Sequence, residues 1–142
     1  MRSRILAFSA AVVVAAAVGG CVPKPKQAYS NDQIKQLESL EELMRVQAEA
    51  ADPQFGRIGQ ASFSEAEYAN LGVLGQKLQA TSEAITSRFS QNRPPSFSSY
   101  AKRLGEQAGE LFTASQAKDA GKASAALTGI RETCKTCHKE HR

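Results

Sequence analysis

The side chains best suited to cofactor chemistry are concentrated in the last nine residues of the chain. Cys134 and Cys137 stand three positions apart, and His138 follows the second cysteine directly. This C-x-x-C-H pattern is typical of the attachment site of a c-type haem, where each thiol forms a thioether bond to a haem vinyl group. The adjacent histidine is then held under the iron as its proximal ligand. The motif therefore predicts one covalent haem c, whose redox chemistry no side chain supplies by itself.

Two other uses of these residues remain open from the motif alone. A structural zinc site would need His141 in addition to both cysteines and His138, all within eight residues. Such sites normally draw their ligands from two separated pairs. A redox dithiol of the thioredoxin type would lie between a strand and a helix of a βαβ unit, and the sequence has no such pattern. Haem attachment is the interpretation that the sequence favours.

Residues 1–20 have the character of a signal peptide. Two arginines precede an apolar run over residues 5–18, which has the length of a signal-peptide core and is short for a membrane span. Residues 18–21, Val-Gly-Gly-Cys, resemble a bacterial lipobox, whose cysteine becomes the lipidated N-terminus. Lipidation of Cys21 would also explain the third cysteine of the chain. An ordinary signal peptide with an incidental Cys21 is the alternative.

Residues 21–30 then read as a lipidated linker, because prolines and lysines occur there without periodicity. C-type haems are attached outside the bacterial cytoplasm, so the export signal and the haem motif support each other. We expect a periplasmic, membrane-anchored lipoprotein. The Val22 that follows Cys21 weakly favours the outer membrane.

The remaining residues, 31–142, suffice for one domain with one hydrophobic core. Without the two arginines of the signal, 16 basic residues face 14 acidic ones, and two haem propionates would cancel the difference. The basic residues are neither clustered nor interleaved with aromatic ones, so we expect no nucleic-acid partner. No nucleophile, paired carboxylates or phosphate-binding loop is evident in the sequence, and we predict no enzymatic activity.

Hydrophobic residues at helical spacing predict four amphipathic helices, and no strand pattern is present. Ser30 with Gln33 and Ser64 with Glu67 form capping boxes that would start the first and second helices. Pro53 is expected to kink or end the first helix.

A firm break at residues 92–95, Asn-Arg-Pro-Pro, separates the second helix from a third that begins near residues 96–98. The fourth helix follows a turn around residues 119–121 and carries the haem motif. Together these elements predict an all-α fold, an antiparallel four-helix bundle with C-terminal haem attachment.

With C-x-x-C-H at the end of the last of four helices, the chain resembles the class II cytochromes c, the cytochrome c′ family. The resemblance covers about residues 31–142 and includes the string Phe-Gly-Arg at residues 55–57. Arg142 matches the family four places after the haem histidine, and the resemblance implies that it lies near the proximal haem face. His141 stands where the family usually has an aromatic residue. It is expected at the surface near the terminus or against a propionate.

The resemblance further implies that the haem packs between the first and last helices, with the first helix on the distal side. Family members with a methionine there are six-coordinate electron carriers, and thioether ligation favours ferrous haem. Members without a distal ligand bind NO or CO. Met44 is the only methionine left after the signal is removed, and we expect it to be the sixth ligand. The alternatives are that Met44 only fills the core, and that Ala48 borders an open gas-binding pocket.

The sequence thus predicts a one-electron carrier of the bacterial periplasm with periplasmic or membrane-bound redox partners. Its membrane contact would be the lipid anchor. Binding of NO or CO is the second hypothesis, and a non-redox structural lipoprotein is the third if no haem is attached. Dimerisation through the first two helices is common in the family, which makes a homodimer a further partner to test.

Overall fold

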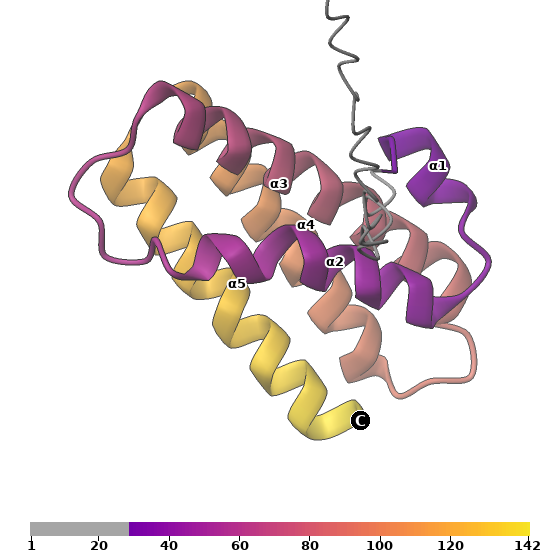
Figure 1. Ribbon diagram of the computed structural model, residues 1–142. Helices are drawn as coiled ribbons and strands as arrows, with labels where there is room; N and C mark the ends of the chain where they lie inside the picture. The colour runs from indigo at the N-terminus through magenta and orange to yellow at the C-terminus, as the bar shows by residue number, and fades with distance from the viewer. Residues whose placement is uncertain (1–28) are drawn as a thin grey trace, which may run out of the picture.

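The computed structural model describes residues 29–142, which form an all-α bundle (Figure 1). The predicted signal peptide, Cys21 and most of the linker lie outside the described residues, and the expectations about them stay predictions. The described helices are α1 (Asn31–Gln36), α2 (Leu40–Phe55), α3 (Glu65–Ala84), a π-helix (Ile85–Phe89), α4 (Pro95–Gln116) and α5 (Ala120–His141). None of these described helices has the length and apolar character that crossing a bilayer requires.

Both predicted capping boxes are confirmed. The Ser30 hydroxyl accepts from the backbone N–H of Gln33, whose side chain accepts from the Ser30 N–H at 2.9 Å. Ser64 and Glu67 form the same reciprocal pair at the start of α3. Each box satisfies two donors that a helix N-terminus would otherwise leave without partners. A third cap, the Asp119 side chain accepting from a backbone N–H of α5 at 2.9 Å, starts the last helix.

The predicted first helix begins at the Ser30 cap as expected but differs from expectation further along. It is divided in two, because Leu37 has extended backbone geometry and Ser39 then caps α2 by accepting from a backbone N–H. Pro53 does not end α2, which continues to Phe55. A proline removes one intrahelical hydrogen bond. Because Pro53 lies two residues before the end of α2, few further hydrogen bonds of the helix follow it.

The second predicted helix reaches the expected end, but its last turn widens into the π-helix. The Ser90 hydroxyl donates to the Ile85 carbonyl at 3.3 Å, five residues back. Single π-turns are uncommon and often border functional sites. Here the turn contributes the buried side chain of Ile85 to the cavity described below.

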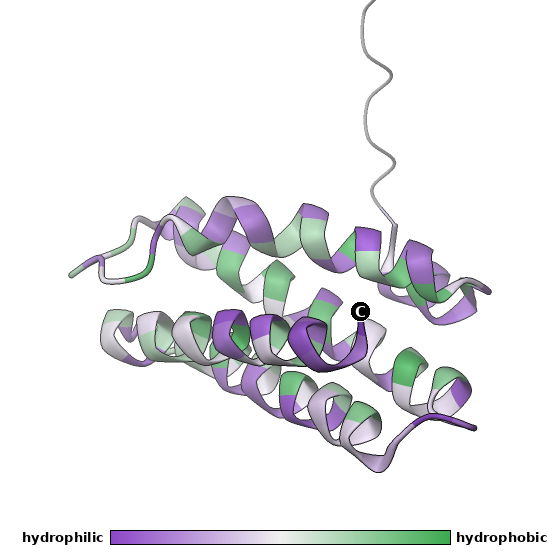
Figure 2. Cartoon of the chain, turned by 90° about the horizontal axis from the view of Figure 1, so that it is seen from below, coloured by the Kyte–Doolittle hydropathy of each residue, from purple (hydrophilic) through white to green (hydrophobic). Residues whose placement is uncertain are grey.

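Helices α3 and α4 form the most extensive pair of the bundle, and α4 also packs along α5. A β-carbon on Gly75 would lie 2.8 Å from the Ala108 carbonyl oxygen, so the two helices approach too closely for a larger residue there. The outer faces are mostly hydrophilic, as are the last turns of α5 (Figure 2). By contrast, α2 and α5 touch only sparsely, and the candidate site lies between them.

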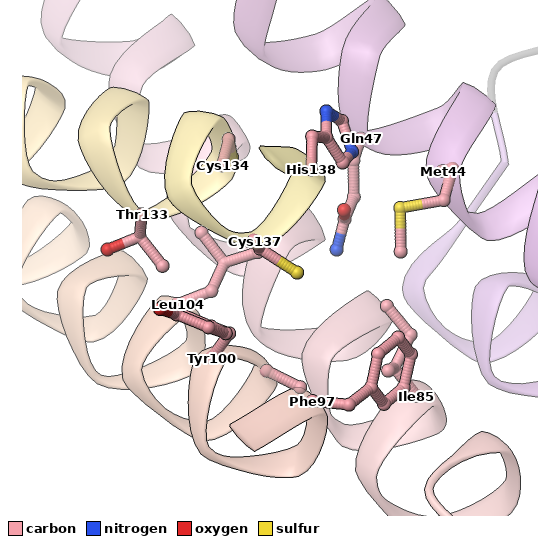
Figure 3. Close-up of a pocket in the computed structure, with 11 residues that line it drawn as sticks. Met44, Gln47, Ile85, Phe97, Tyr100, Leu104, Thr133, Cys134, Cys137 and His138 are labelled. Atoms are coloured by element: carbon pink, nitrogen blue, oxygen red, sulfur yellow. The ribbon is translucent and has the colours of Figure 1, made fainter. Parts of the chain in front are cut away.

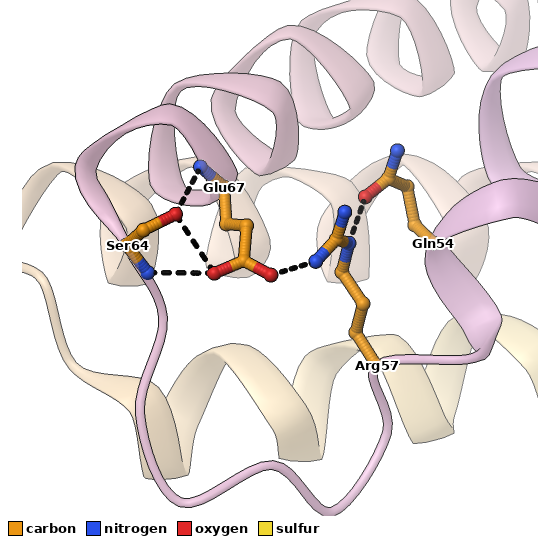
Figure 4. A network of polar contacts seen from close by, with 4 residues as sticks. All are labelled: Gln54, Arg57, Ser64 and Glu67. Atoms are coloured by element: carbon orange, nitrogen blue, oxygen red, sulfur yellow. Dashed lines mark hydrogen bonds and ion pairs between the residues drawn. The ribbon is translucent and has the colours of Figure 1, made fainter.

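The connection between α2 and α3 is fastened by polar contacts of its own (Figure 4). Arg57 pairs with the Glu67 carboxylate, and its Nε donates to Gln54 at 2.9 Å. Gly59 has a φ of 86°, a left-handed conformation that glycine adopts without strain. Its N–H donates to the Ser124 hydroxyl on α5 at 2.7 Å. This end of the bundle is therefore held together by protein groups alone.

Candidate haem-binding site

The last three turns of α5 bring the motif cysteines to one face of the helix. Cys134 and Cys137 are free thiols, both partly buried, and the spacing of three residues places them about one turn apart. Together with His138 they line a cavity between α5, α4 and α2 (Figure 3). The structure therefore presents both thiols and the imidazole to one space, as covalent attachment of a single group requires.

The walls of this cavity are mainly apolar. Its lining comes from α2, the π-helix, α4 and α5 and comprises Met44, Gln47, Ile85, Phe97, Tyr100, Ala101, Leu104, Thr133, Cys134, Cys137 and His138. The inner cavity measures only about 30 Å³, and it adjoins an outer pocket of about 600 Å³. Both spaces share Met44, Phe97, Cys137 and His138.

These residues fit a haem. Sites for cofactors are concave and mostly apolar, with volumes of about 300–1,000 Å³, and the outer pocket lies in that range. Apolar walls suit the macrocycle, thiols suit its vinyl groups and an imidazole suits its iron. The inner cavity has to widen where the ring enters, and α2 can give way because it touches α5 only sparsely.

The two thiols are kept in their protonated form. Burial, with a smaller effect from the neighbouring Cys137, raises the pKa of Cys134 to about 11. Burial, with a smaller effect from Glu140, also raises the pKa of Cys137. Because the thiolate is the reactive form, the raised pKa values lower the reactivity of both thiols at neutral pH.

Met44, the predicted sixth ligand, lies on α2 across the cavity from the motif. Its side chain is partly buried, and its sulfur points into the cavity (Figure 3), which the exposed His138 also lines. Ala48, one turn further along α2, is exposed and lines only the outer pocket. The structure thus brings Met44, and less closely Ala48, to the face that the resemblance assigns to the distal side.

His141 was expected either at the surface or against a propionate, and the structure does not place it free at the surface. Its side chain is 11% exposed, and its ring packs edge-on against Phe97 and Tyr100, with centroids 5.6 and 5.9 Å apart. Its Nε2 lies 3.1 Å from the Ser96 hydroxyl. The imidazole therefore packs against α4 as an aromatic side chain. Arg142 is exposed and lines the outer pocket beside His138.

The zinc alternative loses support from this arrangement. Within residues 29–142, no three or more histidine, cysteine or acidic side chains are grouped so that they could hold a metal ion. His141, the fourth ligand that zinc would need, is turned to Ser96 on α4 instead. The dithiol alternative also lacks its context, since the described residues contain no strand.

Several residues of the site were not identified from the sequence. The Tyr100 hydroxyl donates to Glu140 at 2.7 Å, which raises the pKa of Tyr100 and ties α4 to the end of α5. Gln47 is 7% exposed and lines the inner cavity. A polar residue three places after Met44, on the buried stripe of an amphipathic helix, is the signal that could have identified Gln47.

Comparison with known proteins gives one match. A protein-family model described as cytochrome c′ matches residues 3–142. No curated protein and no solved structure matches the chain.

Proposed function

Because the chain belongs to the cytochrome c′ family of c-type haem proteins, we propose that it carries single electrons with a six-coordinate haem. Cys134 and Cys137 hold the haem, His138 is its proximal ligand and Met44 is its sixth ligand. When bound, the haem supplies reversible one-electron chemistry. The protein contributes attachment, axial ligands and mainly apolar walls around the haem.

One observation carries this proposal: Met44 and His138 line the same cavity from opposite helices. An imidazole on one side and a thioether on the other would close both axial positions of a haem seated between α2 and α5. A closed site favours electron transfer over ligand binding, since no exchangeable position remains on the iron. Thioether ligation also raises the reduction potential.

The apolar walls have a separate effect on the potential. Phe97, Ala101 and Leu104 are buried side chains of α4 that face the cavity. A low-dielectric environment disfavours the more highly charged oxidised state of an iron centre. These residues therefore stabilise the reduced protein in addition to excluding water.

The experiment is an optical spectrum of purified holoprotein together with two Met44 variants. Wild-type oxidised protein should show a low-spin spectrum with a weak sulfur-to-iron band in the red. Met44→Ala and the similarly sized Met44→Leu should both lose the band, and Met44→Ala should bind CO. Leu40→Ala, which alters the same outer pocket from the same helix, should keep the band. A high-spin wild-type protein that binds CO or NO readily contradicts the proposal.

Binding of NO or CO is the second candidate function, and the position of Ala48 favours it. This small, exposed side chain borders the outer pocket that also contains His138. With Met44 turned away from the iron, a diatomic gas could occupy the space beside Ala48. Ala48→Phe should then reduce gas binding, and it should have no effect on CO binding in a six-coordinate carrier.

We also propose that the protein is a lipoprotein on the periplasmic side of a bacterial membrane and exchanges electrons with periplasmic or membrane-bound redox proteins. The Val-Gly-Gly-Cys string at residues 18–21 and the linker after it support this location. Two or more acyl chains anchor a protein stably. Cys21→Ser should release the protein from the membrane fraction, and intact-mass analysis should find lipid on wild-type Cys21. An unmodified N-terminus at another residue contradicts the anchor.

A further inference from the structure

Gln47 is a buried polar side chain in an otherwise apolar part of the site. It is 7% exposed and lies on α2 three residues after Met44, so both side chains share one face of the helix. Burying an amide without hydrogen bonds costs about 1–3 kcal/mol. Leucine would fill this position without that cost, so the amide calls for a reason beyond packing.

The structure fixes the orientation of this amide. The fully buried Thr81 hydroxyl donates to the Leu78 carbonyl at 3.1 Å, which uses its only proton. The same hydroxyl lies 2.9 Å from the side-chain nitrogen of Gln47 and must therefore accept from it. This contact places the nitrogen, and not the oxygen, toward α3. Among residues 29–142, one amide N–H of Gln47 then has a hydrogen-bond partner, and the second N–H and the carbonyl oxygen have none.

The other uncharged polar side chains around the inner cavity have already used their hydroxyl protons. Thr133 donates to Gln107 at 2.9 Å, and Tyr100 donates to Glu140 at 2.7 Å. Among the described residues 29–142 that line the inner cavity, and leaving the motif residues aside, Gln47 is thus the one with an N–H group that makes no hydrogen bond. In an apolar cavity a hydrogen bond from such a donor is stronger than in water.

We infer that Gln47 is a positioning residue for the axial methionine: its free amide N–H donates to the Met44 sulfur when that sulfur ligates iron. The inference rests on the proposed function. A hydrogen bond to the sulfur withdraws electron density from the ligand, which weakens its donation to ferric iron more than to ferrous iron. Gln47 therefore raises the reduction potential, and Thr81 keeps the amide from turning away.

The experiment measures the midpoint potential and the sulfur-to-iron band of holoprotein variants. Gln47→Leu should lower the ratio of reduced to oxidised protein at a fixed applied potential by about three- to tenfold, where tenfold equals about 59 mV for one electron. The band should persist at a shifted wavelength. Thr81→Val, which keeps the amide but removes its anchor, should shift the potential in the same direction by a smaller amount.

Thr133→Val is the matched control for Thr81→Val, because it replaces a buried threonine with valine in the same way, but at a lining residue on α5 whose hydroxyl bonds Gln107 and not Gln47. Its potential should stay close to that of the wild type. An unchanged or raised potential in Gln47→Leu overturns the inference, since removal of polarity alone would favour the reduced state. If Gln47→Leu fails to take up haem, the midpoint potential of Thr81→Val is the test. A potential equal to that of the wild type in Thr81→Val also overturns the inference.

The same measurements separate this inference from the proposed function. A wild-type band with no response to Gln47→Leu refutes the role of Gln47 and leaves Met44 as a ligand. A high-spin wild-type protein without the band refutes Met44 ligation and, with it, the hydrogen bond to the sulfur.

Discussion

The two ends of the bundle are completed in different ways. At the loop end, which comprises residues 54–68 and 114–124, protein groups contact one another across every connection. The Tyr68 hydroxyl donates to the Lys118 carbonyl at 2.8 Å, and the Lys118 ammonium pairs with Glu65 at 2.7 Å. The haem end, formed by residues 40–48, 85–104 and 133–142, has an apolar cavity and an outer pocket between its helices.

This difference shows which part of the fold depends on the cofactor. Packing and hydrogen bonds are satisfied at the loop end without any bound group. At the haem end, α2 and α5 share few contacts, and their facing side chains border the cavity instead of each other. We therefore expect the loop end to fold in the apoprotein, and the sparse contact between α2 and α5 at the haem end to become rigid on attachment.

Among the changes that test this difference between the two ends, removal of both attachment cysteines should have the largest effect. Cys134→Ala with Cys137→Ala leaves no thiol for a thioether bond, so all covalent haem should be lost. Acid-acetone extraction of protein from a host competent in haem maturation measures this, because only non-covalent haem enters the organic phase. Thr136→Ala, an exposed change between the two cysteines, should retain the haem after extraction.

Hydrogen exchange on the double cysteine variant then tests the contrast between the ends. Amides of α2 and of the last turns of α5 should lose protection, and amides near Tyr68 and Leu111 should keep most of theirs. Equal loss of protection at both ends would show that the bundle is one cooperative unit.

Leu111→Ala should produce the reverse pattern. Leu111 is fully buried on α4 in the core cluster that contains Leu71 and Leu127. Truncation of such a side chain costs about 2–5 kcal/mol of unfolding free energy. Chemical denaturation of haem-loaded protein should show this loss, whereas the optical spectrum at the folded baseline stays that of the wild type. A changed spectrum would mean that the two ends are coupled through α4.

Gly75→Ala tests the helix pair that joins both ends. The new β-carbon would meet the Ala108 carbonyl oxygen at 2.8 Å and the Phe112 backbone nitrogen at 3.0 Å. Overpacking of this kind costs about 1–3 kcal/mol, measurable as a lower denaturation midpoint. Gly56→Ala is the matched control, since nothing lies within 4 Å of its added carbon and its φ is −65°. The control should leave stability unchanged or slightly raised.

Acid should weaken the loop end by a smaller amount. Hydrogen bonds from Ser64, with a contribution from Arg57, hold the pKa of Glu67 below its ordinary value of 4.5. A backbone hydrogen bond from Lys122 likewise lowers the pKa of Asp119 below 3.8. A lowered folded-state pKa contributes stability above the unfolded pKa and loses it as pH falls through the folded value. Thermal unfolding between neutral pH and pH of about 3 should therefore show decreasing stability.

Glu67→Gln tests the origin of this pH dependence. The amide can retain part of the cap but cannot titrate, so the variant should start less stable at neutral pH and lose less on acidification. An identical pH dependence in the variant and the wild type would assign the effect to other carboxylates.

Features of the fold that depend on local sequence could be predicted, and features that depend on tertiary packing could not. Capping boxes and helical stripes are local signals, and both boxes and the bundle were predicted from them. The haem motif is also local, which is why its position on the last helix was correct. The break at Leu37 has no local signal in the sequence, and of the two effects expected of Pro53, a kink or an end, the structure excludes the end.

Contacts between distant residues had no signal in a single sequence. The pairing of Gln47 with Thr81 joins positions 34 residues apart, and the packing of His141 against Phe97 depends on how α4 meets α5. Met44 could be assigned to the distal face from the family resemblance. That Met44 and His138 line one cavity depends on how α2 meets α5, for which the sequence has no local signal.

Helix α1 has a consequence for where the haem can travel. Ile34 is fully buried in the same cluster as Leu43 and Phe97, and Lys35 pairs with Glu83 at 2.8 Å, so the N-terminal segment is fastened to the haem end. With Cys21 in a membrane as proposed, Tyr29 lies eight positions after the anchor, a span of at most about 30 Å. The haem would then be confined to a thin layer above the bilayer. Within that layer an anchored redox partner meets it at a high effective concentration, and a freely diffusing partner would gain nothing from the tether.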